Sequence, residues 1–312
     1  MGARDGSAAL GAVAPPTLAG FADEPPQMRS GAVGKNGFLH LGFERRGERT
    51  VLADLASRAP LHAQRALHCD DELPDLAWLF TISTAGCVLQ GDRLATEITL
   101  GPGARAHVTT QSATKVHGMD ANYAAQSQAL VLADEAYLEF LPDPLIPHRG
   151  ARFASDTRIT IAPSASLLYA EVVQPGRLHH HPDECFGLTV LSLATRAQRP
   201  DGTLLFAEKL LIDPVRNPIR QAGVMNGFAV FGNVILCTPP AAADRIHDAI
   251  DARVDEAQGI AYGACRLPNE AGLVFKVVGR ETAQVAAKVR EFWSIARREI
   301  TGAGLPTRFN WR

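Results

Sequence analysis

The sequence predicts a mainly β protein of stacked β-layers, either solenoid-like or a layered sandwich, with two helices near the C-terminus. Short apolar segments alternate with turn residues through most of the chain, as in half-buried strands. One strand–turn–strand pattern also recurs with an alanine at constant spacing, which is typical of repeated β units. Helical periodicity is confined to two segments after residue 239.

The composition bounds the class of protein. A chain of 312 residues with 46% hydrophobic content can bury a full core, and a net charge of -2 gives no field that would attract nucleic acid or an anionic membrane. Its apolar runs are far shorter than the roughly 20 residues needed to cross a bilayer. The five cysteines are scattered without a C-x-x-C pair, which favours free thiols over disulfides or a thiolate metal site. We therefore expect a cytoplasmic protein without nucleic-acid or membrane partners.

The N-terminal region differs from the rest. Residues 1–36 are rich in Ala, Gly and Pro, which predicts a disordered arm, and they contain no continuous apolar stretch like that of a signal peptide. From residue 37 the pattern changes, because Leu39, Leu41 and Phe43 alternate with polar or small residues. We therefore expect a single β-rich domain over residues 37–312.

The recurring pattern consists of two strands around a turn that contains Pro-Gly, Asp-Glu or Pro-Ser. A chance likeness between ordinary hairpins is the competing interpretation. The copies span residues 98–108, 130–140 and 159–169, with marker alanines Ala104, Ala136 and Ala165.

Further elements follow toward the C-terminus. Two apolar runs flank Pro200-Asp201-Gly202, which predicts a hairpin over 188–211, and a second hairpin is expected over 228–237 with its turn at Gly232-Asn233. The spacing of apolar residues predicts helices over 240–257 and 281–300.

Motifs of self-contained catalysis are missing. The chain has no Walker A sequence, no G-x-G-x-x-G after a strand and no G-x-S-x-G. We therefore expect no enzyme activity, but a protein that acts by binding other macromolecules.

Histidines and carboxylates offer candidate metal ligands. His179, His180 and His181 precede Asp183, Glu184 and Cys185, a set of donors that suits a borderline divalent ion. Adjacent residues of a strand point to opposite faces, so only a flexible loop could bring these imidazoles to one ion, and a solvated polar loop is the competing interpretation.

Three carboxylates can be read in two ways. Asp92, in Gln90-Gly91-Asp92-Arg93, either forms an Asx-type turn or faces an interior passage. Glu139 and Glu171 each stand between apolar neighbours, so strand alternation places each carboxylate on the strand face opposite those neighbours. By default that face contacts solvent, and in the alternative interpretation it lines a water-filled channel.

Several longer strings in the middle of the chain resemble the urease accessory protein UreD family, also called UreH. The resemblance covers residues 79–211 and 267–298. It is carried by Gln90-Gly91-Asp92-Arg93-Leu94, Gly101-Pro102-Gly103-Ala104-Arg105-Ala106, Thr109-Thr110-Gln111-Ser112-Ala113-Thr114-Lys115-Val116, residues 138–147, Gly150-Ala151-Arg152-Phe153 and Pro175-Gly176-Arg177.

The resemblance implies a mainly β fold and a role as a scaffold and chaperone with UreF and UreG in GTP-dependent insertion of nickel into apo-urease. It also implies a passage for nickel through the β body, with no tightly bound cofactor. Oxygen donors permit weak, exchangeable binding of Ni²⁺. A stand-alone metal-dependent hydrolase that uses residues 179–185 and an inert β-scaffold binder remain as alternatives. Under the passage hypothesis, the carboxylates to test are Asp92, Glu139, Asp143 and Glu171.

Overall fold

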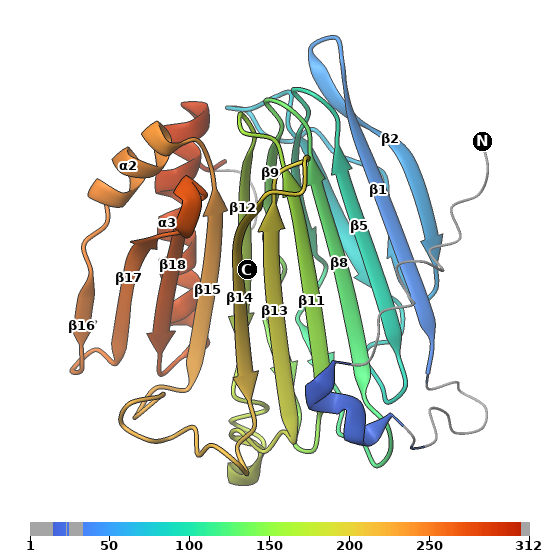
Figure 1. Cartoon of the computed structure of the whole chain (residues 1–312), viewed down its shortest axis with the longest axis vertical. Coiled ribbons are helices and arrows are strands. Elements are labelled where there is room, and N and C mark those ends of the chain that lie inside the picture. Colours follow the sequence, from blue (N-terminus) through green and yellow to red (C-terminus); the bar gives the residue numbers. More distant parts are fainter. Residues whose placement is uncertain (1–14, 23, 25–33, 307–312) are drawn as a thin grey trace.

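A computed structural model describes residues 15–22, 24 and 34–306 and shows two β-sheets stacked face to face, with helices at one side (Figure 1). We call the seven-stranded sheet sheet A. Its strands, in spatial order, are β14 (Leu204–Ile212), β13 (Val190–Gln198), β11 (Arg152–Ile161), β8 (Ala124–Leu132), β5 (Arg93–Leu100), β1 (Asn36–Arg46) and β2 (Arg49–Arg58).

The second sheet, sheet B, has eleven strands. Its main path is β16 (Arg253–Asp255), β17 (Ile260–Arg266), β18 (Gly272–Gly279), β15 (Val230–Cys237), β12 (Ser166–Val173), β9 (Tyr137–Phe140), β6 (Arg105–Thr110), β4 (Ala77–Ser83) and β3 (Leu61–Ala63). Two short strands, β7 (Thr114–Val116) and β10 (Leu145–Pro147), pair with each other, and β10 also pairs with β12.

The three copies of the recurring pattern are arches between the sheets. In each copy the first strand lies in sheet A and the second in sheet B, so β5, β8 and β11 pair in parallel in one sheet, and β6, β9 and β12 do so in the other. The amide of each marker alanine, Ala104, Ala136 and Ala165, donates to the carbonyl three residues earlier at 3.1–3.2 Å. The copies therefore stack as in a solenoid, which confirms the predicted layers, and they are not hairpins.

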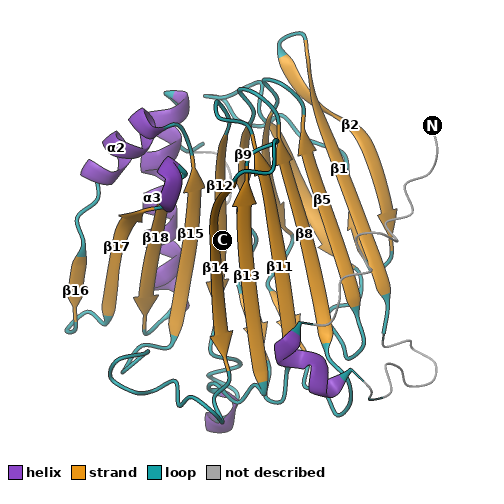
Figure 2. Ribbon diagram, viewed as in Figure 1, coloured by secondary structure: helices purple, strands orange, loops and turns teal. Residues whose placement is uncertain are grey.

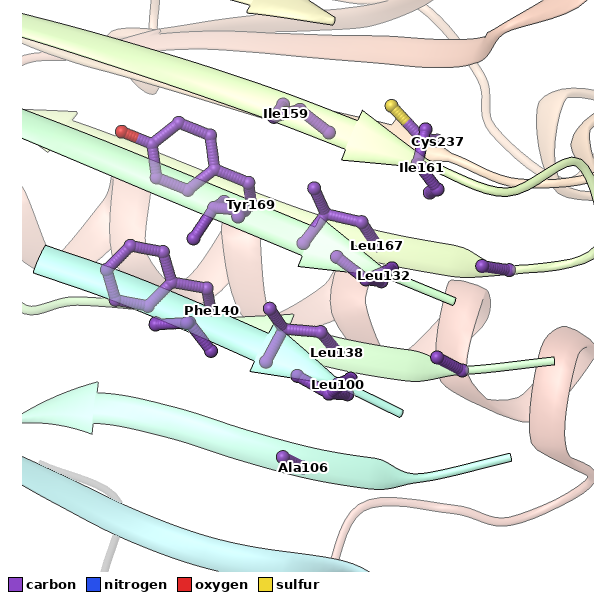
Figure 3. Packing of buried hydrophobic residues seen from close by; sticks show 14 of the residues in the cluster. Leu100, Ala106, Leu132, Leu138, Phe140, Ile159, Ile161, Leu167, Tyr169 and Cys237 are labelled. Carbon is purple, nitrogen blue, oxygen red and sulfur yellow. The ribbon is translucent and has the colours of Figure 1, made fainter. Parts of the chain in front are cut away.

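The main core fills the space between the sheets. Leu100, Leu132 and Ile161 of sheet A face Leu138 and Leu167 of sheet B, and all five are buried (Figure 3). Burial of a leucine or isoleucine side chain contributes about 1.5–3 kcal/mol, so these alternating positions specify which face of each strand turns inward.

Two α-helices pack on the outer face of sheet B (Figure 2). Helix α3 (Thr282–Thr301) buries Phe292 and Trp293 against the sheet, and a capping box at Glu281 and Gln284 begins it. Helix α2 (Pro240–Asp248) is shorter than the expected helix over 240–257, because the chain leaves the helix and forms β16. Within the described residues, no helix is long and apolar enough to span a bilayer.

The chain does not turn at Gly232, so the expected hairpin over 228–237 is instead the continuous strand β15. The glycine serves helix packing. A Cβ at this position would lie 3.1 Å from Val285 and 3.2 Å from Val289 of α3, and 2.9 Å from Val277 of the neighbouring strand. The expected hairpin over 188–211 is present as the antiparallel pair β13 and β14.

Part of the N-terminal arm is ordered against sheet A. Pro16–Phe21 form a 3-10 helix, η1, and Leu18 is fully buried. The Arg152 guanidinium lies 4.1 Å from the centre of the Phe21 ring and pairs with Glu24 at 2.8 Å. These contacts differ from the disorder expected over residues 1–36, whose other residues up to position 33 lie outside the described part. Two further 3-10 turns are η2 (Pro182–Glu184) and η3 (Pro268–Glu270).

Candidate functional site

A cavity of about 160 Å³ with a mixed polar and apolar wall lies between the two sheets. Sheet A contributes Thr96, Gln126, Gln128 and Ser155 to its wall, although the same faces of these strands carry apolar residues further along. A space of this size holds several water molecules, and it has polar groups to bind them. The interior of this sandwich therefore contains, beside its apolar core, a chamber whose wall carries polar side chains among apolar ones.

The Gln128 side chain links two strands of sheet A to each other and to sheet B. The Gln128 side-chain amide donates to the Thr157 hydroxyl at 2.9 Å and to the Tyr169 hydroxyl at 3.0 Å. The hydroxyl of Ser155 is buried and has no hydrogen-bond partner among the described residues. A buried polar atom of this kind normally binds water or an ion, so Ser155 indicates that the chamber is hydrated.

Glu171 lies where this cavity adjoins a second one of about 540 Å³, because its side chain lines both. The Tyr169 hydroxyl donates to Glu171 Oε1 at 2.7 Å. Burial, with a smaller contribution from the negative charge of Glu208, raises the pKa of Glu171 to about 7, although the Tyr169 hydrogen bond opposes the rise. Near neutral pH this carboxyl therefore exchanges protons readily.

Asp143 lines the first cavity together with Glu171. Its backbone amide donates to the Thr110 hydroxyl at 2.8 Å, which fixes the chain where it leaves β9. Lys115 also lines this cavity and supplies a positive charge to the wall. Of the four carboxylates expected along a passage, the structure brings Asp143 and Glu171 to the chamber.

Asp92 is fully buried but lies in a turn. Its carboxylate accepts hydrogen bonds from the amides of Lys35 at 2.7 Å and Leu89 at 2.9 Å, and Gly91 adopts a positive φ of 77°. Both carboxylate oxygens of Asp92 thus accept hydrogen bonds from backbone amides, as expected if this residue forms a turn. Asp92 is not among the residues that line the two cavities.

Glu139 also lies away from the chamber, on the opposite face of sheet B beneath α3. Its carboxylate accepts hydrogen bonds from His107 at 2.7 Å and from the Tyr137 hydroxyl at 2.7 Å. The Arg297 guanidinium of α3 lies 3.4 Å from both Glu139 carboxylate oxygens and also pairs with Asp70. The side chains of Arg297, Asp70 and Glu139 are all fully buried. Glu139 therefore belongs to a closed ionic network that attaches α3 to the sheet.

The network sets its own protonation states. Burial lowers the pKa of His107, so its imidazole is neutral near pH 7 and donates to Glu139. Burial alone would raise the pKa of Glu139, but the His107 hydrogen bond and the Arg297 charge hold it below its ordinary value. The sequence contained one signal of this network: Arg297 lies four residues after Trp293, on the apolar face of α3.

His179, His180 and His181 are exposed in the loop after β12. His179 and His180 line a surface cavity of about 430 Å³, whereas His181 accepts a hydrogen bond from the Asp183 amide at 3.2 Å. Cys185 is contacted by the Arg220 guanidinium at 2.7 Å. In the described part of the chain, no three His, Cys, Asp or Glu side chains are grouped to hold a metal ion.

The chamber wall carries several oxygen donors. Carboxylate, amide and hydroxyl oxygens bind divalent ions in fast exchange when few of them reach the ion at once. Asp143 and Glu171 provide the negative charge, and Gln128 and Ser155 provide neutral oxygens.

Comparison with known proteins places the whole described domain in one family. The family model for UreD urease accessory protein matches residues 35–312. The chain is 53% identical to the urease accessory protein UreD of Yersinia pseudotuberculosis, over 97% of this chain and 94% of that protein. It is 52% identical to UreD of Photorhabdus laumondii, with 95% and 92% covered, and 51% identical to UreD 2 of Brucella suis, with 94% and 97% covered. The chain therefore belongs to the UreD family of urease accessory proteins.

Proposed function

We propose that this protein is a non-catalytic scaffold and chaperone in urease maturation that acts in the cytoplasm. It binds apo-urease together with a UreF-like helical protein and a UreG-like GTPase. Membership of the UreD family supports the role in urease maturation. The sequence has no phosphate-binding loop, so a partner would hydrolyse GTP.

We propose further that Ni²⁺ passes transiently through the chamber between the sheets. The observation that carries this proposal is a cavity between the sheets whose partly apolar wall also carries Asp143, Glu171 and uncharged polar side chains, with a second cavity beyond Glu171. Polar groups that are buried away from water cost stability, and a core of this size could be filled with leucine and valine. The presence of these polar groups in the cavity wall is consistent with a hydrated path.

The test is urease activation in cells that lack the natural gene and are supplied with limiting nickel. Asp143→Ala combined with Glu171→Ala should lower the nickel content and activity of purified urease, while the accessory complex still co-purifies. Excess nickel should restore part of the activity, because weak binding is then compensated by concentration. Glu256→Ala is the matched control, since Glu256 is an exposed carboxylate that lines neither cavity.

Two different failures are distinguishable. Full nickel loading by the Asp143→Ala, Glu171→Ala protein at limiting nickel would reject the path but leave the scaffold role. Fully active urease in cells without this polypeptide would reject the role in maturation. The exposed His179–His181 run stays a predicted surface contact for metal, and its replacement in the same assay separates it from the chamber.

A further inference from the structure

Two histidines far apart in the sequence lie next to each other at one end of the sandwich. His117 follows β7 and His148 follows β10, and these strands pair in parallel with Val116 opposite Pro147. The ring centres of the two imidazoles are 5.7 Å apart, with a 58° angle between their planes. The backbone fixes this arrangement, because the His148 amide donates to the Val116 carbonyl at 2.9 Å.

The His117 ring is oriented by its own backbone. Its Nδ1 lies 3.0 Å from the Gly118 carbonyl, and since a carbonyl can only accept, Nδ1 carries the proton. The lone pair of the neutral ring is then on Nε2. Histidines that bind metals usually have their other ring nitrogen held in this way.

Gly118 holds the two histidine-bearing loops close together. A Cβ at Gly118 would lie 2.5 Å from the carbonyl oxygen of Arg149, the residue after His148. A backbone atom cannot move aside as a flexible side chain could, so glycine is required for this approach. The spacing of the two imidazoles is therefore built into the fold.

His148 is only 8% exposed, but its ring nitrogens are not among the fully buried polar atoms that lack a partner, so the ring edge still reaches solvent. The charged side chains of Arg177 and Glu184 lie near this ring. Arg177 is itself paired with Glu184, which offsets its charge. An imidazole nitrogen that reaches solvent can bind a metal ion from solution.

We propose that His117 and His148 together bind one borderline divalent cation, such as Ni²⁺, Zn²⁺ or Cu²⁺. Imidazole binds such ions at about 2.0–2.1 Å, which places the ion about 3.2 Å from each ring centre and allows ring centres up to about 6.4 Å apart. The observed 5.7 Å lies within that reach. With two protein ligands and the exposed His117 at the surface, water would complete the shell and the ion would exchange readily.

This site is separate from the proposed path, because neither histidine lines the chamber. It can be tested on the isolated full-length protein, independently of urease. The starting variant should carry His179→Ala, His180→Ala and His181→Asn, which removes the neighbouring imidazoles and keeps a side chain able to cap η2. Ni²⁺ is titrated by calorimetry, and Cu²⁺ is examined by electron paramagnetic resonance.

We expect His117→Ala to weaken Ni²⁺ binding by about tenfold or more, since even the loss of a residue that only orients a ligand costs about 10–100-fold. His148→Gln should act similarly, and the double variant should lose little more than either single variant, because both rings hold one ion. The Cu²⁺ spectrum should show two nitrogen ligands. His62→Ala, which removes an exposed histidine elsewhere, should change nothing.

Ni²⁺ affinity that is unchanged in His117→Ala would overturn the proposal. Strictly additive losses in the two single variants, or a Cu²⁺ spectrum without two nitrogen ligands, would also do so. His117 is exposed, so its replacement tests the site even if His148→Gln impairs folding.

Discussion

Tyr169 donates a hydrogen bond of 2.7 Å to Glu171 from two positions earlier on the same strand, and both side chains point into the space between the sheets. The same Tyr169 hydroxyl contacts Gln128 and Thr157 of the opposite sheet. A carboxyl group is therefore anchored at the junction of two cavities by a residue that also bridges the layers. A change at Glu171 or Tyr169 should therefore affect both the charge in the chamber and the stability of the sandwich.

Glu171→Gln should stabilise the protein at alkaline pH. The folded protein holds the Glu171 proton up to a pKa of about 7, whereas the unfolded chain releases it near 4.5, so the folded state binds more protons between these values. Stability then falls as the pH rises through this window. We expect the variant to exceed the wild type by about 1–3 kcal/mol at pH 8 and to match it below pH 5, in urea unfolding curves. Parallel pH profiles would contradict this expectation.

His107 should make the protein labile to acid. Its pKa in the folded protein lies below the ordinary 6.5, so the unfolded chain takes up a proton first as the pH falls, and stability decreases below pH 6.5. His107→Gln should flatten the pH dependence of unfolding between pH 6.5 and 5, even though it loses the stacking of His107 on Trp78. His62→Gln serves as the exposed control, and an unchanged slope in His107→Gln would argue against this origin.

Arg297→Met should destabilise the attachment of α3. The change leaves the carboxylates of Asp70 and Glu139 buried without their counter-charge, which typically costs about 3–5 kcal/mol. Arg298→Met, at the next and exposed position of α3, should cost far less. Adding Asp70→Asn and Glu139→Gln to Arg297→Met should recover part of the loss. Similar urea midpoints for Arg297→Met and Arg298→Met would show that the network does not hold the helix.

Gly176→Ala should disrupt the loop that carries Arg177 and Glu184. Gly176 has a φ of +124°, and a Cβ there would lie 2.3 Å from the Glu184 carbonyl oxygen. We expect a loss of at least about 2 kcal/mol and weaker Ni²⁺ binding at His148, beside which this loop lies. Gly202→Ala has open space around its Cβ, so it should show only the smaller cost of a positive φ. Equal losses in the two variants would contradict the steric argument.

Local patterns predicted the strands well but not how they pair. The alanines Ala104, Ala136 and Ala165 correctly marked equivalent turns, because each needs a small residue at a tight, buried corner. The turn residues could not reveal whether the chain folds back in one sheet or crosses to the other. The turn expected at Gly232 is wrong for a related reason: a glycine that lets a helix pack closely against a strand looks the same in sequence as a glycine in a turn.

The sequence by itself determined the β class, the stacked layers, the two C-terminal helices and the resemblance to the UreD family, since alternation, turn chemistry and recurring strings are local properties. Only the tertiary structure decided what covers each strand face. Alternation correctly placed Glu139 opposite its apolar neighbours, but the packing of α3 made that face a buried ionic network. Likewise, the parallel register of β7 and β10 joined His117 to His148, because such contacts depend on how distant segments align.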